Sequence, residues 1–139
     1  MHIDGFLNFR IAGIDLNIEE IIQTLNIIPT ISYKKGDKYI DKKSRVFVYN
    51  EDCIISDFRI SDEQDLEQAI DKLIEMYLPY SEYIYKLSKQ YAVTFWLSLY
   101  PDTEQFSIHL KNKTINQLQN LGVDIDISFT FLKYFYDGN

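Results

Sequence analysis

The sequence has few of the residues on which metal and redox sites depend. It contains one cysteine, Cys53, and two histidines, His2 and His109. A single cysteine excludes a disulfide within the chain and a zinc site built from cysteines. No nucleophile elbow, phosphate-binding loop or zincin helix is present either. We therefore expect no cofactor, no metal and no catalytic residue of a familiar type.

Long apolar segments are also missing. No run approaches the roughly twenty apolar residues that a membrane-spanning helix needs. The first ten residues, MHIDGFLNFR, lack the basic start and the long apolar core of a signal peptide. We therefore expect a cytoplasmic protein that has no membrane partner.

What is present is typical of a folded domain. Hydrophobic residues make up 46% and aromatic residues 15% of the 139 positions. This composition excludes a disordered chain and predicts a single globular domain over residues 1–139. The net charge of −7 opposes nonspecific binding to nucleic acid, so no nucleic-acid partner is expected.

The first elements are predicted by alternation and by capping residues. Alternating apolar side chains predict a strand over residues 3–12. Asn17 is a good helix N-cap, and Glu20 stands three residues later, where its carboxylate can reach back to the cap. Pro29 cannot continue a helix, so the helix ends before it. Residues 30–44 show poor periodicity and are predicted to be a loop.

The later elements follow from the same signals. Ser61 and Gln64 form a capping box for the second helix, Thr114 caps the third, and Gly122 ends it. Before the second helix we predict a hairpin of residues 45–49 and 53–60 that turns at residues 50–52. The second helix buries Leu66, Ala69, Ile70, Leu73 and Tyr77, and a short helix follows within residues 80–90. Next come a strand over residues 91–100, a strand containing Phe106, Ile108 and Leu110, the third main helix and a last strand over residues 123–129.

This order of elements predicts an α+β fold. Helices with one apolar stripe bury it by lying on a sheet. We therefore expect a two-layer sandwich with a mainly antiparallel sheet and about three helices on one face. The two βαβ-like halves suggest a ferredoxin-like arrangement.

One family shares the pattern of the N-terminal third. The residues of this pattern are Phe9-Arg10-Ile11, Gly13, Asp15-Leu16, Glu19-Glu20-Ile21, Leu25, Pro29-Thr30 and Lys35-Gly36, with Asp65-Leu66-Glu67 and the residues from Leu121 to Asp126 later in the chain. On these residues the chain resembles the domain of unknown function 4279 family. The resemblance implies a small bacterial α+β protein without an established activity. Members often have a tryptophan near the position of Phe58.

Several side chains are predicted to share the sheet face away from the helices: Arg10, Trp96, His109, Asp124 and Asp126. Asp124 and Asp126 project from the same side of a strand, where paired carboxylates can bind a hard cation or share a proton. The plainer interpretation, which we favour, is the solvated side of an edge strand. An exposed tryptophan flanked by charges is a plausible recognition surface. The alternative is that the C-terminal residues cover Trp96 and complete the core.

Charge is unevenly distributed along the chain. Residues 62–78 contain six acids and one base, a net charge of −5, whereas residues 34–45 contain six bases and two acids, a net charge of +4. Glu63, Glu67, Asp71 and Glu75 form an i, i+4 row, called the acidic row below. Like charges at this spacing destabilise a helix, so helix stability does not explain the row. A solvated face explains it most simply, and a docking site for a basic partner is the alternative.

These observations favour a non-enzymatic bacterial protein-binding module. One form is an immunity-type protein that neutralises a basic toxin domain, because an acidic inhibitor gains association rate by electrostatic steering. The alternative is a small-molecule-binding or hydrolytic enzyme that uses the predicted sheet face. A homo-oligomer joined through an edge strand or the aromatic surface is a third hypothesis.

Overall fold

A five-stranded sheet forms the centre of the computed structural model, which describes residues 3–60, 66–101 and 105–130. Its strands lie in the order β2 (Ile31–Tyr33), β5 (Asp52–Arg59), β1 (Ile3–Gly13), β6 (Ala92–Pro101) and β7 (Asp124–Phe129). The pairs β2–β5, β5–β1 and β1–β6 are antiparallel, and only β6–β7 is parallel. The mainly antiparallel sheet is confirmed.

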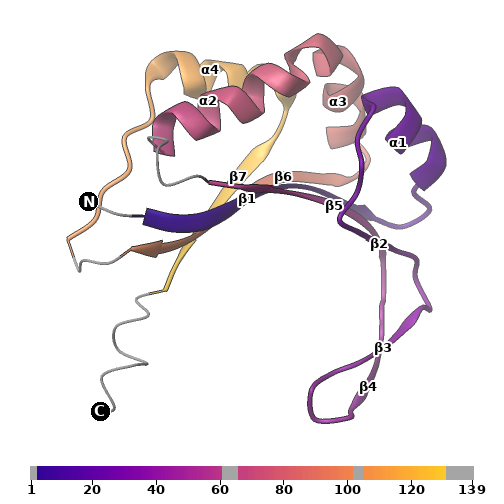
Figure 1. Ribbon diagram of the computed structural model, residues 1–139. Coiled ribbons are helices and arrows are strands. Elements are labelled where there is room, and N and C mark those ends of the chain that lie inside the picture. The colour runs from indigo at the N-terminus through magenta and orange to yellow at the C-terminus, as the bar shows by residue number, and fades with distance from the viewer. Residues whose placement is uncertain (1–2, 61–65, 102–104, 131–139) are drawn as a thin grey trace, which may run out of the picture.

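The helices cover one face of this sheet, as Figure 1 shows. They are α1 (Ile18–Leu25), α2 (Leu66–Tyr77), the short 3-10 helix η1 (Leu78–Tyr80), α3 (Ser81–Ser88) and α4 (Asn112–Leu121). With α1 between β1 and β2, and α2 between β5 and β6, the order β2-β5-β1-β6 is that of a ferredoxin-like unit. Helix α4 and strand β7 extend this unit. The α+β two-layer sandwich is therefore confirmed.

The core lies between the sheet and the helices. Leu7, Phe9 and Ile11 of β1 are buried, and in the register of β1 and β6 they lie opposite Leu97, Phe95 and Val93. The ring of Phe9 stacks on Tyr77 of α2, with ring centroids 4.4 Å apart. The apolar face of the sheet thus packs directly against the helices, as the two-layer prediction requires. Partly buried side chains at the margin of this core are Phe106, Ile108, Ile125 and Ile127.

The predicted N-cap of α1 and the predicted glycine stop of α4 are confirmed. The side-chain oxygen of Asn17 accepts a hydrogen bond from the Glu20 backbone N–H at 3.2 Å. The Glu20 carboxylate bonds the side-chain amide of Asn17 at 3.0 Å, which closes the cap from the other direction. Gly122 follows α4 with φ of 71°, the left-handed conformation of a glycine stop.

The predicted hairpin is wrong in its pairing. Strand β4 (Val46–Val48) pairs with β3 (Lys38–Ile40), whereas β5 pairs with β2 and β1. Hydrogen bonds from Gly36 N to Tyr49 O and from Tyr49 N to Asp37 O extend the two-stranded ribbon of β3 and β4 at its base. The predicted loop of residues 30–44 thus contains two strands. Alternation identifies a strand but not its partner, so the turn was placed too late in the chain.

Two further predictions are wrong. Residues 105–110 form no strand, because β7 occupies the edge of β6 that such a strand would need. Thr114 is not the N-cap of α4, which begins two residues earlier at Asn112. Instead the Thr114 hydroxyl, buried between helices, donates a hydrogen bond to the Asp71 carboxylate at 3.0 Å.

Two predictions concern residues outside the described ranges. The capping box of Ser61 and Gln64 lies outside the described residues, and so do residues 131–139, which were considered as a cover for Trp96. None of the helices in the described ranges has the length and apolar character needed to cross a bilayer.

Candidate functional site

The sheet face opposite the helices carries most of the predicted site residues. In the strand register Arg10 lies beside Thr94, which lies beside Asp124, and Asn8 lies beside Trp96, which lies beside Asp126. Because side chains two positions apart share a face, Arg10, Trp96, Asp124 and Asp126 all project from this side. We call it the open sheet face. The predicted grouping of these four residues agrees with the register.

Arg10 occupies the middle of the open sheet face and is held there by two contacts. Its guanidinium carbon lies 5.8 Å from the centroid of the Trp96 ring, within the range of a cation–π interaction. Its Nη2 atom lies 3.6 Å from the Glu51 carboxylate. Arg10 therefore contacts both an aromatic ring and an acid. Asp124 and Asp126 are exposed on β7, at the edge of the sheet.

His109 is not part of this surface. It was predicted to be an outward-facing sheet residue, but it lies in the irregular connection before α4 and is exposed there. The cause is the pairing of β6 with β7, which leaves no place in the sheet for residues 105–110. The open sheet face thus lacks the imidazole that the enzyme hypothesis would use as a base. Within the described ranges, no group of three or more His, Cys, Asp or Glu side chains is arranged to hold a metal ion.

The two-stranded ribbon continues the open sheet face beyond the edge of the sheet. We call residues 34–49 the arm, and Figure 1 shows it projecting from the side of the sheet opposite the helices. At its base, Tyr33 of β2 pairs with Cys53 of β5, and this register places Tyr33 on the same face as Arg10. The arm and the open sheet face therefore form one continuous surface.

Four aromatic rings, each in contact with the next, follow the arm from its base towards its end. The centroids of Tyr33 and Tyr49 are 3.5 Å apart, those of Tyr49 and Tyr39 are 4.6 Å apart, and those of Tyr39 and Phe47 are 5.2 Å apart. We call this set the aromatic ladder. The aromatic ladder is not predicted from the sequence, because the poor periodicity of residues 30–44 indicates a loop. The signal was present, since all four rings stand at odd positions and so share one side of a regular ribbon.

The base of the ladder is a polar contact with a buried cysteine. Burial, together with a hydrogen bond to Cys53, raises the pKa of Tyr33 to about 12. Cys53 itself is fully buried, as its interpretation as a small apolar group predicts. Tyr33 therefore presents a neutral ring at the junction of arm and sheet.

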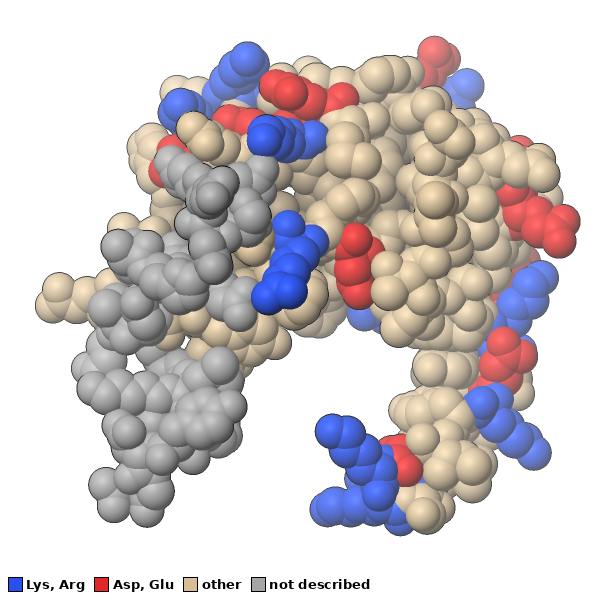
Figure 2. Space-filling model, viewed as in Figure 1, with Lys and Arg blue, Asp and Glu red and all other residues tan. Residues whose placement is uncertain are grey.

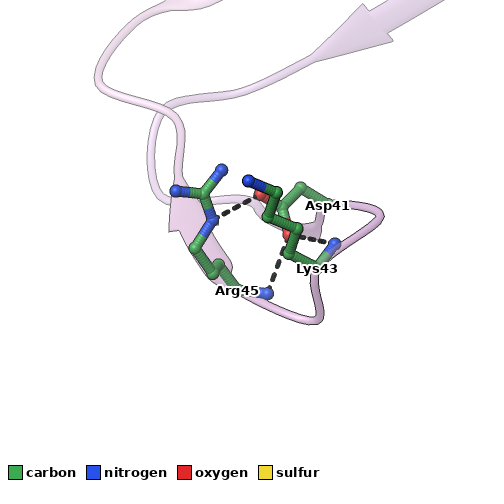
Figure 3. Close-up of polar contacts among 3 residues, drawn as sticks. All are labelled: Asp41, Lys43 and Arg45. Carbon is green, nitrogen blue, oxygen red and sulfur yellow. Dashed lines mark hydrogen bonds and ion pairs between the residues drawn. The ribbon is translucent and has the colours of Figure 1, made fainter.

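The end of the arm is shaped by Asp41, as Figure 3 shows. One carboxylate oxygen accepts hydrogen bonds from the backbone N–H groups of Lys43 and Arg45, at 2.9 and 2.8 Å. The other accepts from Nε of Arg45 at 2.7 Å. These bonds, the Arg45 backbone N–H first, hold the pKa of Asp41 below its ordinary value. The Arg45 guanidinium carbon also lies 5.4 Å from the Phe47 ring centroid, so it extends the aromatic ladder.

The other side of the arm is aliphatic and exposed. Ile40 pairs with Val46, and Val48 pairs with Lys38, so these side chains alternate with the aromatic ladder. Their exposed fractions are 70% for Ile40, 61% for Val46 and 57% for Val48. We call these three residues the aliphatic side. Exposed apolar groups that are contiguous in this way mark interaction sites on soluble proteins.

The acidic row lies on the helix layer, away from the arm. Glu63 falls outside the described residues, and Glu67, Asp71 and Glu75 stand on successive turns of α2. Asp71 accepts the hydrogen bond from Thr114 of α4, so its carboxylate connects two helices. Glu75 is exposed. One acid of the row therefore has a structural explanation that the sequence did not suggest.

Hollows elsewhere among the described residues include two that are partly lined by apolar side chains. One of about 180 Å³ has an apolar wall and two bases, and its lining residues are Leu7, Phe58, Arg59, Ala69, Lys72, Leu73 and Met76. The other, of about 250 Å³, lies between the start of α1 and α3 and is lined by residues that include Glu20, Tyr83 and Tyr91. Neither includes Arg10, Trp96, Asp124 or Asp126.

Comparison with known proteins yields one family. A model of the family described as domain of unknown function (DUF4279) matches residues 4–132. No curated protein and no solved structure matches the chain.

Proposed function

Since the chain belongs to the DUF4279 family, whose description names no activity, we propose from its surface that it is a non-enzymatic bacterial protein-binding module of the cytoplasm. The observation that carries this proposal is the continuous surface formed by the open sheet face and the aromatic ladder. It runs from Trp96 and Arg10 through Tyr33 to the stacked pair of Phe47 and Arg45. Tyrosine, tryptophan and arginine are the residues that contribute most to protein interfaces.

The shape of this surface favours a macromolecule over a small ligand. Figure 2 shows the arm standing away from the body, with a hollow between the arm and the underside of the body. Two rings of the aromatic ladder, Tyr39 and Phe47, stand on β3 and β4, whose residues are all exposed. A small molecule is usually enclosed by its pocket, whereas a wide and open surface suits a protein partner.

One form of this proposal is an immunity-type protein for a basic toxin domain. The net charge of −7 and the exposed carboxylates of Asp124 and Asp126 support it. Charge of one sign on the inhibitor raises the association rate with an enzyme of the opposite sign. The acidic row, now reduced among the described residues to Glu67, Asp71 and Glu75, is the other surface that such a partner can use.

The test is binding of a basic toxin domain encoded immediately beside the gene, measured by calorimetry and by relief of toxicity. Trp96→Ala and the double variant Asp124→Asn with Asp126→Asn should each weaken binding by about tenfold or more. Glu19→Gln, at an exposed acid of α1 outside both surfaces, is the matched control and should leave affinity unchanged. If Glu75→Gln slows association while the open-face variants bind normally, the partner uses the acidic row instead. No binding to any such domain would overturn the immunity form.

The alternative of a small-molecule-binding or hydrolytic enzyme has one supporting observation. The hollow lined by Arg59 and Lys72 places two cations beside apolar side chains, which suits a small amphipathic anion. The site that the sequence predicts for this activity is incomplete, because His109 lies outside the open sheet face, and Arg10 is engaged there by Trp96 and Glu51.

A further inference from the structure

We propose that the open sheet face is occupied by the arm of a second copy of this chain, so that two molecules exchange arms in a reciprocal dimer. This inference rests on the proposed function, because it names the occupant of the same surface. It is carried by three properties of the arm: its exposure, its charge and its direction.

The arm is too exposed to be explained as part of a single molecule. All six residues of β3 and β4 are exposed, including the aliphatic side of Ile40, Val46 and Val48. A two-stranded ribbon is at best marginally stable alone in water. The aromatic ladder and the Asp41 turn order the ribbon, but they cover only one of its sides. The aliphatic side is therefore available to a partner surface.

The charge of the arm is complementary to the rest of the same chain. The arm carries +4, and since the whole chain carries −7, the remaining residues carry −11. Figure 2 shows basic side chains gathered at the free end of the arm. Two arms would repel each other, whereas the arm of one copy and the body of another attract. A second copy therefore fits this arm better than an acidic lipid surface, which the body would repel.

The direction of the arm points to the open sheet face as its receiving surface. The arm projects on that side of the sheet, beside the hollow seen in Figure 2. The buried Asp52 carboxylate accepts hydrogen bonds from Lys35 N at the base of the arm and from Leu16 N of the body, and this restraint opposes folding of the arm onto its own open sheet face. The arm of a second copy is free of this restraint. In a two-fold dimer each copy then supplies one arm and one receiving face.

The contacts expected across this interface are apolar at the centre and charged at the rim. Ile40 and Val46 of one copy meet apolar side chains of the open sheet face on the other, which include Trp96 of β6 and, three strands away on β2, the exposed Ile31. Lys42 and Lys43, at the end of the arm, approach Asp124 and Asp126 on the strand at the sheet edge. Apolar burial provides affinity here, and the charges fix which surfaces meet.

The first experiment is the oligomeric state of the full chain by sedimentation equilibrium and light scattering. The unmodified protein should be a concentration-dependent dimer. Val46→Asp should raise the dissociation constant of the dimer by about tenfold or more, because it places a charge in the apolar centre. Ile115→Asp is the matched control: Ile115 is an exposed aliphatic residue on α4, and this variant should dimerise normally. Melting curves of both variants show whether the fold is intact.

The second experiment is a charge exchange between arm and face. Lys42→Glu with Lys43→Glu, and separately Asp124→Lys with Asp126→Lys, should each weaken the homodimer because like charges then meet. An equimolar mixture of the two variants should form a heterodimer, since both of its arm-to-face contacts again join opposite charges. Only a contact between the arm and the open sheet face predicts this recovery.

Three outcomes would overturn the inference. They are a monomer at every concentration, a dimer that Val46→Asp and the charge variants leave unchanged, and a monomer that binds vesicles of anionic lipid through the arm. If the chain is a monomer and a basic toxin domain still binds the open sheet face, this inference fails while the proposed function stands. If the toxin domain does not bind either, the protein-binding role of this surface fails as well.

Discussion

Asp52 is the residue that connects the arm to the body of the domain. Its carboxylate is buried and accepts hydrogen bonds from Leu16 N at 2.9 Å and from Lys35 N at 2.8 Å. These two backbone groups belong to the segment before α1 and to the base of the arm. The hydrogen bond from Lys35, followed by that from Leu16, holds the pKa of Asp52 below its ordinary value. The sequence suggested only a turn at this position.

Asp52 should make the stability of the domain depend on pH in the acid range. Since its folded pKa is depressed, its contribution is complete above the ordinary pKa of aspartate, about 3.9, and is lost as the pH falls through the lower folded pKa. Asp52→Asn should lower the free energy of unfolding at neutral pH by about 1–3 kcal/mol, because the new amide leaves a buried N–H unpaired. The variant should also lose part of the acid dependence.

Denaturant unfolding at neutral pH and near pH 3 measures both effects. Asp126→Asn, at an exposed position of β7, is the control and should change neither quantity appreciably. Equal acid dependence in Asp52→Asn and in the unmodified protein would show that Asp52 does not carry this linkage.

At the scale of elements, α1 shows how one helix face is fixed by its neighbours in the fold. Leu25 at the end of α1 is 2% exposed, whereas Ile28, three residues later, is 90% exposed. Asn26, with φ of 52°, ends the helix in the left-handed conformation and sends the chain towards β2. The Pro29 turn predicted from the sequence therefore begins earlier, at Asn26.

Leu25→Ala should lower the free energy of unfolding by about 2–5 kcal/mol, because it removes a buried aliphatic side chain and leaves a cavity. Ile28→Ala removes a side chain of the same size from an exposed position and should change stability by less than about 0.5 kcal/mol. Urea unfolding of the two variants gives both values. A loss below about 1 kcal/mol for Leu25→Ala would mean that the helix face is placed incorrectly.

At the scale of the whole molecule, the domain consists of a body with its own core and an arm without one. Every residue of the hydrophobic core lies in the body, and β3 and β4 contribute none. Loops and projections of this kind on a stable scaffold commonly carry function, since the scaffold does not depend on them. The arm should therefore be dispensable for folding and necessary for binding.

Replacing residues 38–48 by Asn-Gly tests this division. Asp37 and Tyr49 already face each other through the hydrogen bond from Tyr49 N to Asp37 O, so a two-residue turn can join them. The shortened chain should unfold cooperatively, with a free energy of unfolding within about 3 kcal/mol of the original, the upper value for the two lost aromatic pairs Tyr39–Phe47 and Tyr39–Tyr49. Calorimetry measures the transition. Loss of cooperative unfolding would show that the arm is part of the folded core.

The sequence by itself determined the elements whose signals lie within a few residues. Asn17 and Glu20 mark the start of α1, Gly122 marks the end of α4, and the alternation from Val93 to Leu99 marks β6. The layers followed from these elements, because helices with one apolar stripe need a sheet to cover. The family was also evident from the pattern of the N-terminal third.

Only the tertiary structure decided which strands pair and what the surface therefore presents. The edge of β6 can accept one strand, and β7 takes it, so His109 is excluded from the sheet. Strand β4 pairs with β3 rather than β5, which creates the arm and aligns the aromatic ladder. The physical reason is that a cap or a turn forms from neighbouring residues, whereas strand edges are filled by competition between segments far apart in the chain.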